Sequence, residues 1–317
     1  MPRLCRRPDR RRGLCGSEER RSGGATPMNV ASLATPPVDS KYEIAHLKLV
    51  PKRHIGRMIV AGGVLLLFAG LVRAFSVGQI EWSYVRDFLF APAILVGLYN
   101  TLLMTVAAMG LGIVLGVVIA IMRISGNPVL SSIAIGYIWV FRGAPALLQL
   151  MLWFNLALIF PTLGIPGLFE FRTVDVMTPF VAAVLGLGIS QGAYTSEVVR
   201  SGLLSVDSGQ YEAARTIGMT QMMMLRRIVL PQAMRVMVPP VGNEVIGMVK
   251  LTSLASVIQY SEILHNAQII YFANTRVLEL LLVASFWYLL VVSVLSIGQH
   301  YIERYFGRGS KSIRSSM

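Results

Sequence analysis

Residues 91–122 read APAILVGLYNTLLMTVAAMGLGIVLGVVIAIM, a run that holds no charged side chain. About 20 apolar residues are enough for an α-helix to cross the hydrocarbon core of a bilayer. Backbone groups find no water there, so such a segment must close its hydrogen bonds internally, as a helix. The run therefore predicts a membrane span, and with it an all-α integral membrane protein.

Five further apolar blocks accompany this run, so the sequence predicts about six transmembrane helices. Composition agrees, because only 14% of the residues are charged, whereas soluble domains carry about 25%. We expect the block with Pro239 and Pro240 to break there, since a proline ring removes a backbone hydrogen bond and clashes with the preceding turn. The five blocks cover residues 58–75, 133–160, 176–199, 228–258 and 277–297.

The basic residues predict the orientation of the chain. If the N-terminus lies inside and the chain crosses six times, the inside segments hold 23 Lys and Arg and the outside loops hold 3. Lys and Arg concentrate in cytoplasmic segments, so we expect both termini in the cytoplasm of a multi-pass inner-membrane protein surrounded by lipid. Orientation in the membrane then explains the net charge of +13, and the charge does not indicate binding to nucleic acid. The inside segments are residues 1–57, 123–132, 200–235 and 299–317.

The first 27 residues differ from the rest in composition. They are polar, rich in Arg and nearly free of aromatic side chains, which is typical of disorder. We expect translation to start at Met28. Cys5 and Cys15 have no nearby His, so they predict no metal site.

The chain shows no nucleotide-binding or metalloprotease motif. We find no Walker A pattern, no HExxH and no Rossmann glycine fingerprint. The four histidines are scattered near segment ends. The sequence therefore predicts a non-catalytic protein without cofactor or bound metal, in which any active transport draws energy from an ion gradient or from a partner.

The longest inside segment, residues 200–235, is unusual for a connector. It reads RSGLLSVDSGQYEAARTIGMTQMMMLRRIVLPQAMR. Residues 210–217 predict a short helix with Asp207 or Ser208 as its N-cap. Gly218 fits the left-handed position that ends many helices.

A second short helix is expected after this glycine. Thr220 is its predicted N-cap, and we expect it to run to about Val229 and to be disrupted by Pro231. Ala213 and Ala214 keep one face of the first helix small enough to enter a groove on a partner. The segment thus predicts a compact helical knob at the membrane surface.

Several motifs resemble the polar amino acid permeases of the histidine/glutamine type, a subfamily of bacterial ABC import permeases. The loop resembles their EAA loop. The residues that carry the resemblance are Glu212-Ala213-Ala214, Gly218, Ile228-Val229-Leu230-Pro231, Gly209-Gln210, Pro231-Gln232-Ala233, Gly97-Leu98-Tyr99-Asn100-Thr101-Leu102, Phe141-Arg142-Gly143-Ala144-Pro145, Leu148-Gln149-Leu150, Gly192-Ala193-Tyr194, Glu197, Arg200, Lys250 and Thr252-Ser253-Leu254. Two positions depart from the pattern: Ala144 stands where Thr is usual, and Leu251 where an acidic or amide residue is usual.

The resemblance implies a type I ABC importer permease core with a cytoplasmic coupling helix, and the import of a polar amino acid by alternating access. It implies cytoplasmic ATPase subunits, a second permease, identical or related, and an extracytoplasmic solute-binding protein as partners. It assigns ATPase coupling to Gly209, Gln210, Glu212, Ala213, Ala214, Gly218, Leu230 and Pro231. The expected domains are a basic segment (1–57), an extra transmembrane helix (58–77), the permease domain (93–300) and a cytoplasmic tail (301–317).

Polar and charged residues at membrane depth are candidates for the translocation path, because such groups are costly in lipid. Structural uses remain open: Arg142 can brace a bend beside Pro145, Glu197 can pair with Arg200 one turn away, and Glu212 can cap its own helix instead of bonding an ATPase. The candidates are Arg142, Gln149, Gln191, Thr195, Glu197, Asn243 and Lys250.

Two other classes of membrane protein remain as alternatives. An ion-coupled secondary transporter would need inverted repeats and an ion site, and no convincing repeat is present. An electron-transfer subunit usually carries His pairs within its spans for haem, and no span here has two. The pairs Gly112/Gly116 and Gly188/Gly192 predict close helix packing, either within the chain or against a second subunit.

Overall fold

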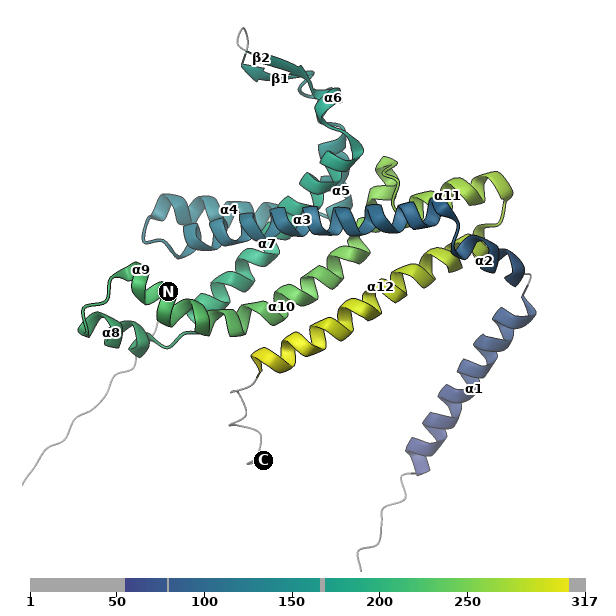
Figure 1. Cartoon of the computed structure of the whole chain (residues 1–317), viewed down its shortest axis with the longest axis horizontal. Coiled ribbons are helices and arrows are strands. Elements are labelled where there is room, and N and C mark those ends of the chain that lie inside the picture. The colour runs from purple at the N-terminus through teal and green to yellow at the C-terminus, as the bar shows by residue number, and fades with distance from the viewer. Residues whose placement is uncertain (1–54, 79, 166–168, 308–317) are drawn as a thin grey trace, which may run out of the picture. The chain divides into compact units, whose positions relative to one another are not determined.

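The computed structural model describes residues 55–78, 80–165 and 169–307 (Figure 1). The expectations for residues 1–54, including the start at Met28, lie outside this part. In chain order the elements are α1 (Ile55–Val77), α2 (Trp82–Leu89), α3 (Pro92–Ile124), α4 (Pro128–Gly143), α5 (Ala146–Phe154), η4 (Leu156–Leu158), β1 (Thr162–Ile165), β2 (Phe169–Arg172), α6 (Thr173–Val176), α7 (Pro179–Leu204), α8 (Ser208–Thr216), α9 (Gln221–Met224), η5 (Leu225–Val229), α10 (Leu230–Leu251), η6 (Thr252–Ile258), α11 (Ile263–Asn274) and α12 (Val277–Phe306).

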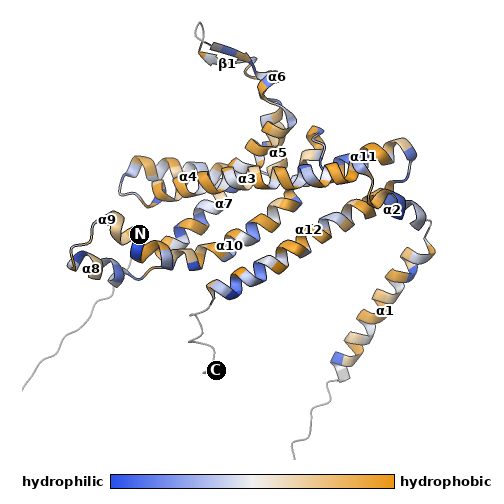
Figure 2. Cartoon of the chain, in the orientation of Figure 1, coloured by the Kyte–Doolittle hydropathy of each residue, from blue (hydrophilic) through white to orange (hydrophobic). Residues whose placement is uncertain are grey.

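Every predicted apolar block is largely helical in the structure. By length and composition, four helical stretches in the described part can span a membrane, or five if α4 and α5 together form one bent span. The six-span count is therefore approximate: α7 coincides with a predicted block but is not among these five. Apolar colouring runs along most of α1, α3 and α12 (Figure 2). Taken on its own, α1 is exposed and apolar around its circumference.

The two glycine pairs pack α3 against α7 within the chain. A Cβ on Gly112 would lie 2.8 Å from Gln191 Cγ, and one on Gly188 would lie 2.8 Å from Leu111 Cδ2. Close backbone approach is how helices associate where lipid is as apolar as their side chains. Of the two interpretations left open by the spacing, the structure shows packing within one subunit.

A sharp bend separates α4 from α5. The two helices meet at 100° across Ala144 and Pro145. A residue before proline avoids the helical region, so α4 ends there. The Gln149 side-chain amide donates to the carbonyls of Phe141 and Ala144, at 3.0 and 2.9 Å. This amide thereby gives each of the two carbonyls at the end of α4 a hydrogen-bond donor.

A continuous helical arm runs from Gln221 to Ile258, through α9, η5, α10 and η6. The prediction that Pro231 disrupts this helix is wrong. The π-helical turn η5 precedes Pro231, which lies in the first turn of α10. A proline has no N–H to donate, and the π-helical turn, which shifts the hydrogen-bond pairing by one residue, accommodates it without interrupting the arm.

The predicted break at Pro239 and Pro240 is also wrong, because α10 continues through both. Prolines are tolerated inside membrane helices because neighbouring helices and small local adjustments compensate for the lost hydrogen bond. The Gln299 side chain of α12 packs against this stretch and donates to the Pro239 carbonyl at 2.8 Å, which holds α10 against α12. Gly242 makes room for it, since a Cβ there would lie 1.8 Å from Gln299 Oε1. The arm changes to 3₁₀ geometry only at Thr252.

A two-stranded hairpin lies between α5 and α7. Its strands β1 and β2 pair antiparallel, with Thr162 opposite Arg172 and Ile165 opposite Phe169. The sequence predicted only a loop over residues 161–175. A separate apolar cluster joins α3, α11 and α12 around Ile94, Ile263 and Leu280.

Candidate functional site: a cavity with a carboxylate and an exposed helical loop

A cavity of about 290 Å³ with a mixed polar and apolar lining lies among α5, α7 and α10. The 100° bend before α5 brings Ala144 and Ala146 to its wall. One acidic side chain, Glu244, faces the cavity from α10. The lining residues are Ala144, Ala146, Leu187, Ser190, Gln191, Tyr194, Glu244, Gly247 and Leu251.

A chain of hydrogen bonds fixes the Glu244 carboxylate. Gln191 Nε2 donates to Thr195 Oγ1 at 3.2 Å, and Thr195 Oγ1 donates to Glu244 Oε2 at 2.7 Å. Gln191 and Thr195 are buried, and Glu244 is half-buried. Among the described residues, no Lys or Arg lies within ion-pair distance of Glu244. A charge held at membrane depth without a counter-ion is a functional-site hypothesis by default.

Arg142 lies behind one wall of this cavity. Its guanidinium carbon is 5.1 Å from the centre of the Tyr194 ring, within the range of a cation–π contact. Tyr194 lines the cavity, whereas Arg142 does not. Arg142 stands in the last turn of α4, directly before the bend. This placement favours a bracing use of its side chain.

The other candidates for the path divide among different places. Gln149 is buried at the bend and is not part of the cavity lining. Asn243 is exposed, and its amide lies 3.4 Å from Glu303 Oε1. Lys250 lines a separate cavity of about 280 Å³ with Ser253 and Tyr288. Only Gln191 and Thr195 lie with Glu244.

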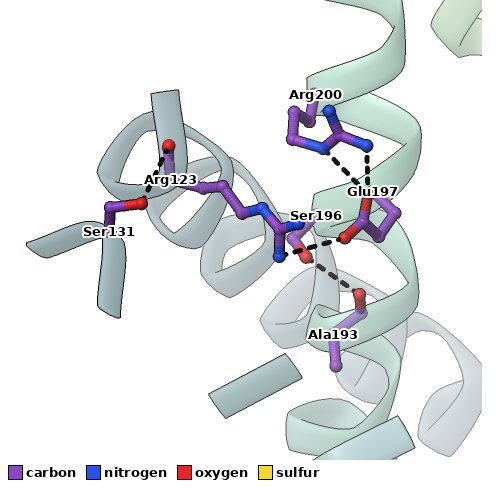
Figure 3. A network of polar contacts seen from close by, with 6 residues as sticks. All are labelled: Arg123, Ser131, Ala193, Ser196, Glu197 and Arg200. Atoms are coloured by element: carbon purple, nitrogen blue, oxygen red, sulfur yellow. Dashed lines mark hydrogen bonds and ion pairs between the residues drawn. The ribbon is translucent and has the colours of Figure 1, made fainter. Parts of the chain in front are cut away.

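Glu197 belongs to an ion cluster, shown in Figure 3. Its Oε2 is 2.8 Å from Arg200 NH2, so the pair expected one helical turn apart is formed. Its Oε1 is also 3.4 Å from Arg123 NH1, at the end of α3. The cluster therefore ties α3 to α7, which is a structural use of this carboxylate.

The α8–α9 loop, residues 207–224, is built by local capping. Asp207 Oδ1 accepts the Gly209 N–H at 2.7 Å, and Thr220 Oγ1 accepts the Met223 N–H at 3.3 Å. Gly218 adopts φ +75°, the left-handed conformation that few side chains tolerate. The predicted caps and turn are present. Glu212 does not cap α8, because Asp207 fills that position.

One face of the loop is buried and the other is open. Ala214 is 1% exposed and packs against Met224 and Val229 of the same chain. It does not belong to a free face, contrary to our expectation, because α8 folds back on η5. Ile217 is 74% exposed and lies directly before the left-handed turn. All members of the assigned coupling set except Ala214 are exposed: Gly209, Gln210, Glu212, Ala213, Gly218, Leu230 and Pro231.

Two residues of these sites were missing from the candidates drawn from sequence. Glu244 stood in an apolar block as an isolated carboxylate, and that signal alone was enough to single it out. Ile217 had no such signal, since an apolar residue in a short helix is usually turned inward.

Comparison with known proteins places these sites in context. The family described as "Binding-protein-dependent transport system inner membrane component" matches residues 112–308. The arginine transport system permease protein ArgU of Corynebacterium glutamicum is 39% identical over 284 residues, 88% of this chain and 87% of that protein. The glutamine transport system permease protein GlnP of Escherichia coli K12 is 33% identical, over 71% of this chain and 97% of that one.

Solved structures show the same likeness. An amino acid ABC transporter crystallised with histidines superposes with a TM-score of 0.62 at 32% identity, over 72% of this chain and 99% of that chain. The methionine ABC transporter in an inward-facing conformation matches with a TM-score of 0.51 at 20% identity, which shows the fold alone.

Proposed function

Since this chain belongs to the family of binding-protein-dependent transport system inner membrane components, we propose how its cavity and its α8–α9 loop serve import. It is the permease subunit of an amino acid ABC importer and a multi-pass protein of the inner membrane. Members of this family work with an ATPase and a binding protein. The relatives give no support to the ion-coupled alternative.

The α8–α9 loop is the proposed docking element for the ATPase. Its exposed face carries an acidic residue, Glu212, and a large apolar one, Ile217, on a turn made rigid by two side-chain caps. A rigid element of this kind transmits movement better than a mobile loop. The excess of Lys and Arg on the loop's side of the membrane supports a cytoplasmic position for it and for both termini.

The assembly follows from this arrangement. Two permeases, identical or related, form the pathway, and each presents one α8–α9 loop to an ATPase subunit. ATP is hydrolysed in those partners. When the ATPase pair closes, it moves the two loops together and rocks the permeases between inward- and outward-facing states, a rigid-body transition. A solute-binding protein delivers the amino acid on the other side.

The amino acid is proposed to pass through the Glu244 cavity and to carry a positively charged side chain. The half-buried carboxylate, held by Thr195 and lacking a cation in the described part, is the observation on which this rests. The ammonium or guanidinium group of such a substrate would pair with the Glu244 carboxylate, which has no cationic side chain of the described part as its counter-ion. The arginine permease relative agrees with such a substrate.

Uptake of labelled arginine by vesicles that contain the complete transporter tests this proposal. Glu244→Gln keeps the shape of the side chain but removes its charge. A hydrogen bond to a charged group contributes about 1.5–3 kcal/mol, so the KM for arginine is expected to rise by roughly 10- to 100-fold. Glu170→Gln, on the exposed strand β2, is the matched control and leaves the KM unchanged. An unchanged KM in Glu244→Gln contradicts the proposal.

A further inference from the structure

The motif Gly97–Leu102 on α3 faces the turn that joins η6 to α11. Asn100 Nδ2 donates to the Ser261 carbonyl at 2.8 Å. The Ile263 N–H donates to Thr101 Oγ1 at 3.3 Å. Gly97 allows the close approach, because a Cβ there would lie 3.0 Å from the Glu262 carbonyl carbon and oxygen. Three residues of one motif thus hold three consecutive residues of the turn.

The other side of the turn is held as firmly. Glu262 is fully buried and caps α11, where it accepts the N–H groups of Leu264 and His265 at 2.8 and 2.6 Å. The Tyr288 hydroxyl of α12 donates to the same carboxylate at 2.5 Å. Asn266 Nδ2 donates to the Ala93 carbonyl of α3 at 2.7 Å. Buried hydrogen bonds in lipid have no water to replace them.

The turn stands at one end of the helical arm from Gln221 to Ile258. The α8–α9 loop stands at the other end, because α9 continues through η5 into α10 without a break. Glu244, Gly247 and Leu251, which line the cavity, lie between the two ends. One end of the arm is therefore exposed to a partner, and the other is fixed to α3 and α12 (Figure 1).

We propose that Gly97, Asn100 and Thr101 are positioning residues that fix the far end of this arm. The inference rests on the proposed function of the α8–α9 loop. With the far end fixed, a displacement imposed at the loop changes the geometry around Glu244. With the far end free, the whole arm moves together with the loop, so the geometry of the cavity does not change. ATP is then hydrolysed without transport of the amino acid. The three residues touch the turn and not the amino acid.

The first test replaces Asn100→Leu in the complete transporter reconstituted in vesicles. It measures ATP hydrolysed per labelled arginine delivered. We expect that ratio to rise at least about fivefold, the lower range of an energetic coupling between two sites. Tyr99→Phe is the matched control, since Tyr99 is an exposed neighbour in the same motif, and it keeps the wild-type ratio. If the Asn100→Leu ratio is unchanged, even with both rates lowered, the residue is merely structural and the proposal is overturned.

The second test does not depend on a destabilising change. Asn100→Cys and Ser261→Cys, with Cys5→Ser and Cys15→Ser, are joined by a short thiol cross-linker. A fixed anchor tolerates this bond, so import is expected to continue at the wild-type ratio. If cross-linking stops import, the turn moves during transport and the proposal is overturned. The wild-type complex tests the proposed function separately. If the wild-type complex imports arginine and the Asn100→Leu variant keeps the wild-type ratio, only the anchor is rejected and the proposed function stands.

Discussion

The Thr195 hydroxyl donates to Glu244 Oε2 at 2.7 Å and so joins α7 to α10 at the cavity wall. Thr195→Val removes this donor from the carboxylate and removes the acceptor of the Gln191 Nε2 hydrogen bond. The loss of one such bond costs about 1 kcal/mol. We expect the KM for arginine to rise roughly fivefold in vesicle uptake assays. Thr195→Ser keeps the hydroxyl and should restore uptake, whereas a wild-type KM in Thr195→Val would speak against a role for this bond.

Ile217 exposes an apolar side chain beside the left-handed Gly218. If this side chain inserts into the ATPase, a charge there must be desolvated on docking, which costs far more than a buried methyl group gains. Ile217→Asp is expected to abolish co-purification of the ATPase, while the amount of folded permease in the membrane stays unchanged. Ile217→Leu is the control that keeps the apolar contact. Recovery of a stoichiometric complex with Ile217→Asp would place the docking surface elsewhere.

Gly112 and Gly110 lie on the same helix but in different surroundings. A Cβ on Gly112 would lie 2.8 Å from Gln191 Cγ, whereas one on Gly110 meets no atom within 4 Å. Overpacking a close helix contact costs about 1–3 kcal/mol. In thermal unfolding of the detergent-solubilised protein, Gly112→Ala is expected to lower the Tm and Gly110→Ala to leave it unchanged or raise it. Equal Tm values for the two variants would contradict close packing of α3 on α7.

Local sequence signals predicted the local structure well. Apolar blocks marked the long helices, and Asp207, Gly218 and Thr220 occupy the cap and turn positions expected of them. Each of these features depends on neighbours within a few residues. The pairing of Glu197 with Arg200, one turn away, belongs to the same class.

Contacts between distant segments were out of reach. The contact that holds α10 at the Pro239 carbonyl comes from Gln299, 60 residues away, and the burial of Ala214 depends on the fold-back of the loop. Nothing near Gln149 in sequence indicates that its amide pairs with carbonyls of the preceding helix instead of facing the path. Thr195 and Glu244 are 49 residues apart in the sequence, and they lie side by side because α7 packs against α10.

The π-helical turn at Leu225–Val229 determines the directions in which the side chains of α10 point around the helix axis. A wide turn of this kind accommodates one more residue than an α-helical turn. Each residue advances an α-helix by about 100° around its axis. Deleting one residue from this turn would therefore swing Glu244 about 100° away from Thr195, although the deletion lies well before the cavity in the chain. The direction in which the Glu244 side chain points therefore depends on one additional residue at the opposite end of the helix.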